Sequence, residues 1–499
     1  MKQFCLIVFG FFLSTFAVKA NNLVIGTTTY SSANQTLTFT VAWDNSWSIS
    51  SGPSNWDAVW IFVKRQNCSG NNDWVHQLVS TTSADHNAQN GGAQSTIVAV
   101  NAAADGMGVF VRRIGTNVVG NVSAQTITLK LGATNPSITT SNSDNFEVLG
   151  VEMVYVPQGQ FYIGDGRPSN TNNFSAGNTN QPLLITSSVQ ASGLGTYNNY
   201  VTNPAYGCSV ALPSTFPLGY NGYYCMKYEI QQGLVVEFLN TLTYDQQAKR
   251  LAAWGRLPNV LNAYFDENWY YVNVKVSTAG TYNTVPAVFS CSFPYIPQSH
   301  LNWTDFTAIL DWSGLRPMTE FEYEKACRGP LNPVAYEYPW GNTTINFMNN
   351  GQSSATVNYG VAEGFCHGGA WNGGPIRAGF AANATTNRSQ GGVTYYGIMD
   401  MAGQLFEQCI GGGNGYNYST FTNLNGDGVL GENGNANTAN WPLDGGTNSG
   451  TIVKGGFFNT SSGNLPAFQV SDRQYYGGTN SNLSIYKDRS MGGRGVRTF

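Results

Sequence analysis

The chain has 499 residues, enough material for about two to four domains. Only 10% of the residues are charged and the formal net charge is -4, whereas about 25% are charged in an average soluble protein. These values exclude a basic nucleic-acid-binding protein and a charge-rich disordered chain. The 13% of aromatic residues and the 58 glycines favour an exported, loop-rich protein of the mostly β or α+β class.

The first twenty residues have the pattern of a cleaved export signal. Met1-Lys2 gives a positive start, an uncharged apolar run from Phe4 to Val18 follows, and Val18-Lys19-Ala20 resembles a small-residue cleavage site. A membrane anchor is the alternative, but this run of about 15 residues is shorter than the roughly 20 that a spanning helix needs. Residues 1–20 are therefore expected to be a signal peptide. The mature chain is expected to be secreted, or to lie at the cell surface or in the periplasm, with no membrane span.

Residues 21–148 are predicted to form an all-β domain. Apolar residues alternate with threonines between Leu37 and Trp43, and this period of two is typical of a half-buried strand. The unbroken apolar run Ala58–Val63 suits a strand in the core of a sandwich. Since no helical period interrupts this part, a β-sandwich of about 120 residues is expected. Further predicted strands lie at 96–100, 108–111 and 127–131.

Tryptophans beside Asp and Asn form an aromatic cluster in this domain, at 43–47 and 55–57. Aromatic faces of this kind can stack on sugar rings. They are also typical of sandwich corners, where Asp and Asn form turns. The sequence favours the structural interpretation and leaves the sugar-stacking one open.

From residue 149 to 499 the pattern changes to that of a second, α+β domain with long loops and few helices. Two short strands separated by a Pro-Gln-Gly turn predict a β-hairpin over Met153–Gly164. An apolar stripe over Val235–Leu242 predicts a helix. The Thr319-x-x-Glu322 capping box predicts another helix through Ala326, which Gly329-Pro330 ends.

Seven sequence blocks stand in a specific order in this second part. They are MVYVP at 153–157, YEI at 228–230, RPMTEFEYEKACRG at 316–329, YPWGN at 338–342, YGIMDMAGQLFE at 396–407, KGG at 454–456 and GVR at 495–497. Together they resemble the formylglycine-generating enzyme (sulfatase-modifying factor) family over roughly residues 153–499. The resemblance implies a C-type-lectin-like α+β domain, and the N-terminal part lies outside it.

The chemistry of that family is not matched as well as its sequence blocks. Its oxidising members use two copper-binding cysteines after the Gly-Gly, whereas Gly455-Gly456 is followed by Phe457, Phe458, Asn459 and Thr460. Thr460 stands near the first cysteine position, and no cysteine follows Cys409. Without thiolates there is no soft ligand pair for Cu(I) and no thiol for a redox step. Copper is therefore not expected and the chain is interpreted as non-catalytic, with an enzyme that uses other residues left open.

The resemblance implies calcium as the cofactor. The segment 400–407 matches an ion-binding loop of the family, which implies side-chain oxygens from Asp400 and Glu407 and backbone oxygens from Gly403 and Leu405. Calcium binds such mixtures of oxygen ligands. The alternative for Glu407 is a local cap or ion pair. A second, more loosely matched site is implied with the ligands Asn349 or Asn350, Glu363 and the carbonyl oxygen of Phe365.

The C-terminal segment is predicted to be a recognition surface. It is dense in Tyr, Asn, Ser, Asp and Arg, a composition typical of adaptable binding surfaces. The expected ligand is an extracellular protein or glycan, and homo-oligomerisation is left open. The alternative is that its arginines form internal salt bridges. The candidate ligand-binding residues are Arg473, Tyr475, Tyr476, Tyr486 and Arg489.

Overall fold

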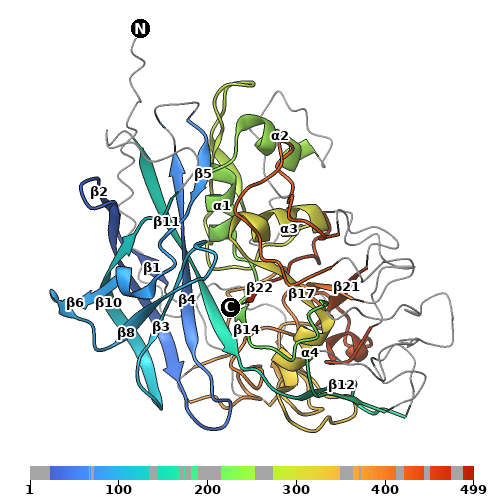
Figure 1. Ribbon diagram of the computed structural model, residues 1–499. Coiled ribbons are helices and arrows are strands. Elements are labelled where there is room, and N and C mark those ends of the chain that lie inside the picture. Colours follow the sequence, from blue (N-terminus) through green and yellow to red (C-terminus); the bar gives the residue numbers. More distant parts are fainter. Residues whose placement is uncertain are drawn as a thin grey trace. The chain divides into compact units, whose positions relative to one another are not determined.

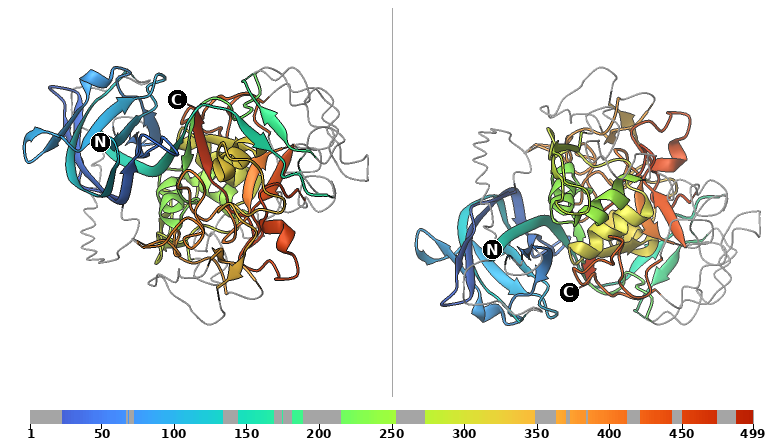
Figure 2. Two further views of the ribbon diagram at one scale, coloured as in Figure 1. Left: turned by 90° about the horizontal axis from the view of Figure 1, so that it is seen from below. Right: turned by 90° about the horizontal axis from the view of Figure 1, so that it is seen from above.

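The computed structural model describes residues 23–66, 68, 72–133, 144–168, 174, 181–188, 215–252, 273–348, 363–369, 373–383, 385–411, 421–442, 450–473 and 487–498. The chain divides into two compact units. The first consists of Met1–Trp47 and Val59–Val151, and the second of Ser48–Ala58 and Glu152–Phe499. The first unit is built almost entirely of strands, and the second holds the four α-helices of the described residues (Figures 1 and 2).

Two groups of strands make up the first unit. One contains β1 (Val24–Ile25), β2 (Thr29–Ser31), β3 (Thr36–Ser48), β6 (Asn87–Asn90), β7 (Ala93–Gln94) and β10 (Val118–Lys130). Its order is β1-β3-β10-β6-β7, with β2 beside β3. The other contains β4 (Asp57–Gln66), β5 (Trp74–Gln77), β8 (Val98–Ala102), β9 (Val109–Arg113) and the first part of β11 (Asn145–Val156). Its order is β11-β4-β9-β8, with β5 beside β4.

Side chains from both groups form one core in the first unit. In β3 the side chains of Leu37, Phe39, Val41 and Trp43 are buried, and the threonines between them are not. In β4 the run Ala58–Val63 is fully buried. Both strand predictions are therefore confirmed. Burial of each such apolar side chain stabilises the fold by about 1.5–3 kcal/mol.

The segment Ser48–Ala58 lies inside the predicted first domain but belongs to the second unit. Nδ2 of Asn55 donates to the carbonyl oxygen of Tyr396 at 2.7 Å. The ring of Trp56 stacks on Tyr155 with centroids 4.3 Å apart, and its Nε1 donates to the hydroxyl of Tyr224 at 3.0 Å. Trp56 is therefore committed to internal packing, as the structural interpretation of the aromatic cluster expects for this residue.

The sheet of the second unit positions the sites described below. It contains the end of β11, β14 (Tyr223–Met226), β17 (Arg316–Thr319), β20 (Glu407–Ile410), β21 (Thr451–Lys454) and β22 (Gly495–Thr498). The order is β21-β20-β17-β22-β14-β11. The β17–β20 pair is parallel and the other pairs are antiparallel.

The predicted hairpin over Met153–Gly164 is wrong. Both strands form, but β11 pairs with β14, and β12 (Phe161–Ile163) pairs with β13 (Leu183–Ile185). The strand β14 is buried along its whole length, so this long-range pairing places β11 inside the sheet and replaces the local one. Two further two-stranded sheets are β15 (Lys275–Thr278) with β16 (Val288–Ser290), and β18 (Asn346–Phe347) with β19 (Phe365–Cys366).

The helices of the second unit are α1 (Gln232–Asn240), α2 (Tyr244–Ala252), α3 (Trp303–Trp312) and α4 (Glu320–Arg328). The predicted capping box of α4 is confirmed, because Thr319 Oγ1 accepts from the N–H of Glu322 at 3.2 Å and Glu322 Oε2 accepts from the N–H of Thr319 at 2.9 Å. Gly329 ends α4 with φ 66°, a conformation that favours glycine. No helix in the described part of the chain is long and apolar enough to cross a bilayer.

Candidate functional site

The loop after Gly455 and Gly456 is where the resemblance places a lost active site. Both glycines adopt left-handed backbone angles, with φ 86° and 68°, and a Cβ on Gly455 would lie 2.6 Å from the carbonyl oxygen of Met401. The turn therefore requires glycine there. It directs Phe458 inward, where the side chain is 3% exposed and its ring stacks on His367 with centroids 6.3 Å apart.

Thr460 lies further along this loop, and its hydroxyl already has a hydrogen-bond partner. Its Oγ1 accepts from the N–H of Phe457 at 2.9 Å, and the residue is buried. The ring of Phe457 packs on Phe406 with centroids 5.1 Å apart. The loop is therefore filled by packed aromatic rings and a bonded hydroxyl.

His367 is fully buried beside this loop. Its Nδ1 lies 2.9 Å from Oε1 of Gln404, an oxygen that also accepts from the N–H of Ile376 at 3.0 Å. Nδ1 therefore carries the proton, and the acceptor Nε2 has no hydrogen-bond partner among the described residues. Burial lowers the pKa of His367 to about 4, so the imidazole is neutral at neutral pH and cannot donate a proton to a substrate as an acid would.

The thiols near the loop are also held in an unreactive form. Cys366 precedes His367, and its Sγ lies 3.3 Å from the carbonyl oxygen of Ala402. Burial raises the pKa of Cys366 well above its ordinary value, and the same holds for Cys409. Because the thiolate is the nucleophile and the metal ligand, neither cysteine is suited to the redox step as it is placed here.

Buried charges meet where β14 ends and where β20 and β22 begin. Arg494 is fully buried, and its Nε and Nη2 lie 2.6 and 2.5 Å from Oε1 of Glu407. Glu229 accepts a backbone N–H with Oε1, while Oε2 of Glu229 and Oε2 of Glu407 have no hydrogen-bond partner in the part of the chain that the structure describes. Oδ2 of Asp400 accepts from the N–H of Gly379 at 2.5 Å. Arg494 and Arg377 therefore face three buried carboxyl groups, and burial raises the pKa of each of these acids.

This cluster contains the predicted calcium ligands, arranged around a cation that the chain itself supplies. Glu407 is paired with Arg494, and the N–H groups of Gly403 and Leu405 donate to Gly455 and Glu229. Calcium takes about six to eight oxygen ligands, and no group of three or more His, Cys, Asp or Glu among the described residues could hold a metal ion. In this arrangement Arg494 engages Oε1 of Glu407, so a calcium ion at Glu407 would have to displace that contact or use Oε2. Glu407 forms the local ion pair that the sequence left open, and calcium binding by the protein stays a prediction.

Substitution of Glu229 by glutamine is expected to change how stability depends on pH. Burial raises the pKa of Glu229 well above its ordinary value, and the charge of Glu407 raises it further. Above the ordinary pKa of about 4.3 the unfolded chain ionises Glu229 while the folded chain keeps its proton, so the free energy of unfolding falls as pH rises through this window. Glu229→Gln removes that fall.

The measurement is the melting temperature of wild type and Glu229→Gln between about pH 5 and 8. The melting temperature of the variant, relative to that of the wild type, should increase steadily as pH rises. If the difference between the two melting temperatures is constant across this pH range, or if the variant is favoured mainly at acid pH, the assignment of a raised pKa to Glu229 is contradicted.

Of the second predicted calcium site, only Glu363 and Phe365 are described. Glu363 is exposed, and its Oε1 accepts from Nδ2 of Asn387 at 3.1 Å. Phe365 begins β19 and its ring lies 5.7 Å from that of Phe380. The remaining candidates of this site, Asn349 and Asn350, lie outside the described residues, so the site stays a prediction.

The predicted recognition surface is described only in part. Arg489 is exposed. Arg473 is instead 1% exposed and pairs with Glu320, with its guanidinium 4.1 Å from the ring centroid of Phe174. Its guanidinium is therefore not available to a ligand, and the internal salt bridge that the sequence left open is the correct interpretation for this residue. The predicted ligand-binding tyrosines outside the described residues are Tyr475, Tyr476 and Tyr486.

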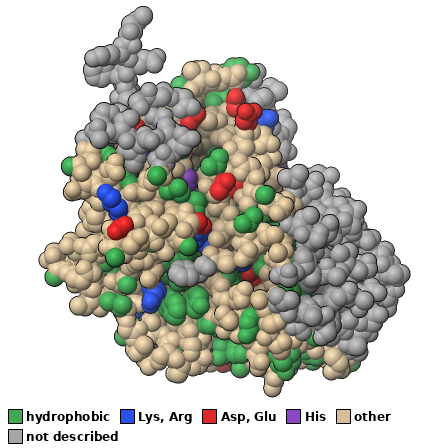
Figure 3. Space-filling model, viewed as in Figure 1, with side chains coloured by type: hydrophobic (Ala, Val, Ile, Leu, Met, Phe, Trp, Pro, Cys, Tyr) green, Lys and Arg blue, Asp and Glu red, His purple; other side chains and the backbone are tan. Residues whose placement is uncertain are grey.

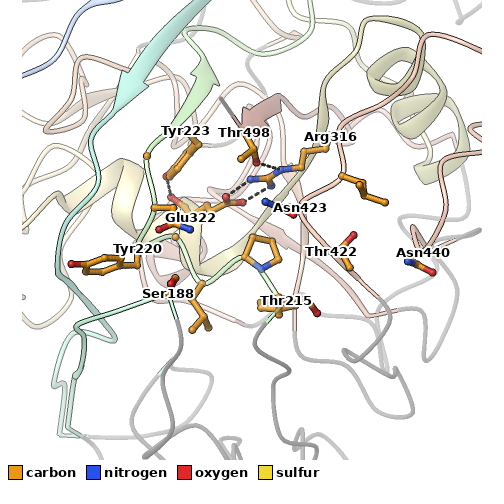
Figure 4. A pocket seen from close by; sticks show the side chains of 17 residues that line it. Ser188, Thr215, Tyr220, Tyr223, Arg316, Glu322, Thr422, Asn423, Asn440 and Thr498 are labelled. Atoms are coloured by element: carbon orange, nitrogen blue, oxygen red, sulfur yellow. Dashed lines mark hydrogen bonds and ion pairs between the residues drawn. The ribbon is translucent and has the colours of Figure 1, made fainter. Parts of the chain in front are cut away.

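A pocket of about 430 Å³ opens where β14 and β17 begin and β22 ends (Figure 4). Antiparallel pairing sets Tyr223 opposite Thr498 and brings Arg316 beside them. Nη1 and Nη2 of Arg316 lie 2.9 and 2.6 Å from the two carboxylate oxygens of Glu322, and Nε donates to Oγ1 of Thr498 at 3.0 Å. Among the described residues, Arg316 and Glu322 are the charged residues that line the pocket, and the pair is neutral as a whole. Sequence reasoning missed the pocket because its lining comes from segments far apart in the chain.

Two comparisons with known proteins identify the family. Residues 140–481, more than half of the chain, match the sequence profile of the sulfatase-modifying factor enzyme 1-like domain. A formylglycine-generating enzyme from Thermomonospora curvata is 32% identical over 120 residues, which cover 23% of this chain and 33% of that enzyme. The chain therefore matches about a third of the length of that relative. On the profile match, the chain belongs to the sulfatase-modifying factor family, as the order of its sequence blocks predicted.

Proposed function

We propose that this protein is a non-catalytic member of the family that acts as an extracellular binding module. The observation that carries the proposal is the packed loop after Gly455-Gly456, where Phe458 is buried and the hydroxyl of Thr460 is already bonded. Beside it, burial keeps the thiol of Cys366 protonated and the imidazole of His367 neutral. A loop of this kind offers no reactive group, so the proposed role is binding.

The distribution of charge supports a partner that is not strongly charged. On the face shown in Figure 3, the charged side chains that can be seen are few and scattered among neutral ones, in keeping with the 10% of charged residues. The proposed partner is an extracellular protein or glycan. The export signal predicted for residues 1–20 and the C-type-lectin-like fold implied by the resemblance would suit this role.

An enzyme of the same family that uses other residues is the competing candidate. The similarity to a formylglycine-generating enzyme favours it. So does Nε2 of His367 beside the loop, which accepts no hydrogen bond from the residues that the structure describes. It requires that this buried nitrogen become accessible to a substrate or a metal.

The test is incubation of the purified protein with copper and a peptide that contains the Cys-x-Pro-x-Arg motif, followed by mass spectrometry. No conversion of the cysteine to an aldehyde is expected, since the described thiols near the loop are buried and protonated. The enzyme from Thermomonospora curvata serves as the positive control. Turnover of the peptide by this protein would reject the non-catalytic proposal and favour the enzyme.

A further inference from the structure

We propose that the pocket in Figure 4 binds a neutral, hydroxyl-rich ligand, namely a carbohydrate chain. This inference rests on the proposed binding function and gives it a place and a ligand class. It concerns a different surface from the C-terminal residues that the sequence singled out. The pocket volume of about 430 Å³ lies in the range of small-ligand sites, about 300–1,000 Å³.

The charge of the pocket argues against an ionic ligand. Arg316 and Glu322 supply its charged groups, and each neutralises the other through two hydrogen bonds. The remaining contacts of Arg316 include Oγ1 of Thr498 and the carbonyl oxygen of Pro317. An anion would need a free cation, and a cation would need a free carboxylate, to offset the loss of its hydration. A neutral ligand needs neither.

The walls of the pocket carry neutral hydrogen-bonding groups that the described protein does not use. Oγ1 of Thr422 is buried without a partner. The side chains of Asn423 and Asn440 are exposed and line the pocket, and Asn423 lies beside the Arg316–Glu322 pair in Figure 4. Tyr220 adds a half-buried phenol. Amides and hydroxyls can both donate and accept, which matches the hydroxyl groups of a sugar.

Apolar surface lies next to these polar groups. Phe216 is buried in the lining, Pro217 is half-buried, and Leu424 is 47% exposed. A sugar ring presents hydroxyls at its rim and C–H groups on its faces. It can therefore bond to the amides while a C–H face packs against Tyr220 or Leu424. A strongly apolar ligand would leave the hydroxyl of Thr422 and the amide of Asn423 without partners.

The experiment is a glycan array probed with the full mature protein, with neutral oligosaccharides and their sulfated and sialylated counterparts side by side. The best neutral oligosaccharide is then titrated by calorimetry against wild type, Tyr220→Ala, Asn423→Ala and the control Tyr282→Ala. Tyr282 is 56% exposed and does not line the pocket. We expect Tyr220→Ala to weaken binding about tenfold or more and Asn423→Ala about threefold. The control should bind normally, and the melting temperatures should change little.

Each other outcome overturns the inference. No binding of neutral oligosaccharides up to about 10 mM, or binding restricted to the charged glycans, rejects the ligand class. Binding that both pocket variants leave unchanged rejects the site while leaving a binding function in place. The non-catalytic proposal is tested separately, by the assay with copper and the Cys-x-Pro-x-Arg peptide. Its failure there can therefore be distinguished from failure of this inference.

Discussion

Replacement of Lys227 by methionine is expected to lower the free energy of unfolding of the second unit by about 3–5 kcal/mol. Nζ of Lys227 lies 3.1 Å from Oε2 of Glu152 and 3.4 Å from Oδ2 of Asp57, and the lysine side chain is 0% exposed. Burial alone would lower its pKa, but Tyr228 and the two carboxylates raise it above the ordinary value. Methionine has a similar volume but leaves two buried carboxylates without a cation.

The prediction is checked by urea unfolding of the full chain. The unfolding is monitored with a spectroscopic signal that reports on the second unit. Lys249→Met is the matched control, because Lys249 is exposed on α2, and it should change stability by no more than about 0.5 kcal/mol. Combining Lys227→Met with Asp57→Asn and Glu152→Gln removes all three charges and should recover much of the loss. A loss below about 1 kcal/mol for Lys227→Met alone would contradict the role given to these three buried charges.

The position of Asp57 in the sequence shows that the second unit uses residues from the N-terminal part of the chain. Asp57 belongs to the segment Ser48–Ala58, which is part of the second unit although it lies far from Glu152 in the sequence. That segment also contributes the Asn55 hydrogen bond to Tyr396. A chain that began after residue 58 would therefore leave Lys227 with Glu152 alone, so the second unit depends on residues from the N-terminal part.

The sequence predicted those elements whose signal is local. Alternation and an unbroken apolar run identified β3 and β4, and the capping box identified α4. It missed α3, although Asn302 caps this helix by accepting from the N–H of Asp305. All but one residue of α3 is buried, so the helix shows no polar face and no amphipathic period.

Two buried ion pairs of the second unit could not be predicted, because their partners are far apart in the chain and no motif joins them. Lys227 and Glu152 are 75 residues apart, and Arg494 and Glu407 are 87 apart. The one signal in the sequence that pointed to these buried pairs was the composition. In a chain with only 10% charged residues, a charge within an apolar stretch, such as Lys227 directly after β14, is a candidate for burial with a partner. Composition indicates that such partners exist and does not say which residues they are.

Arg494→Met is expected to destabilise the second unit by about 3–5 kcal/mol or more, because Arg494 is the cation that Glu407 contacts. Nη1 of Arg494 also donates to the carbonyl oxygens of Met226 and Lys227 at 3.3 and 3.2 Å, and Nη2 to that of Asp400 at 3.2 Å. Its removal strips the cation from Glu407 and leaves these carbonyls short of a donor. The measurement is again urea unfolding, and the double variant Arg494→Met/Glu407→Gln should recover part of the loss.

The same variants distinguish an internal cation from a bound calcium ion. With Arg494 paired to Glu407, the chain supplies its own positive charge at this position, so Glu407→Gln should leave the response of the melting temperature to EDTA unchanged. A ligand that binds only the folded state would instead raise stability by about 2.7 kcal/mol at a hundredfold excess over its Kd. If EDTA lowers the melting temperature and Glu407→Gln abolishes that response, calcium binds at Glu407 in solution and Arg494 must move to admit it. If EDTA has no effect while Arg494→Met is strongly destabilising, the arginine stabilises this loop in place of a metal.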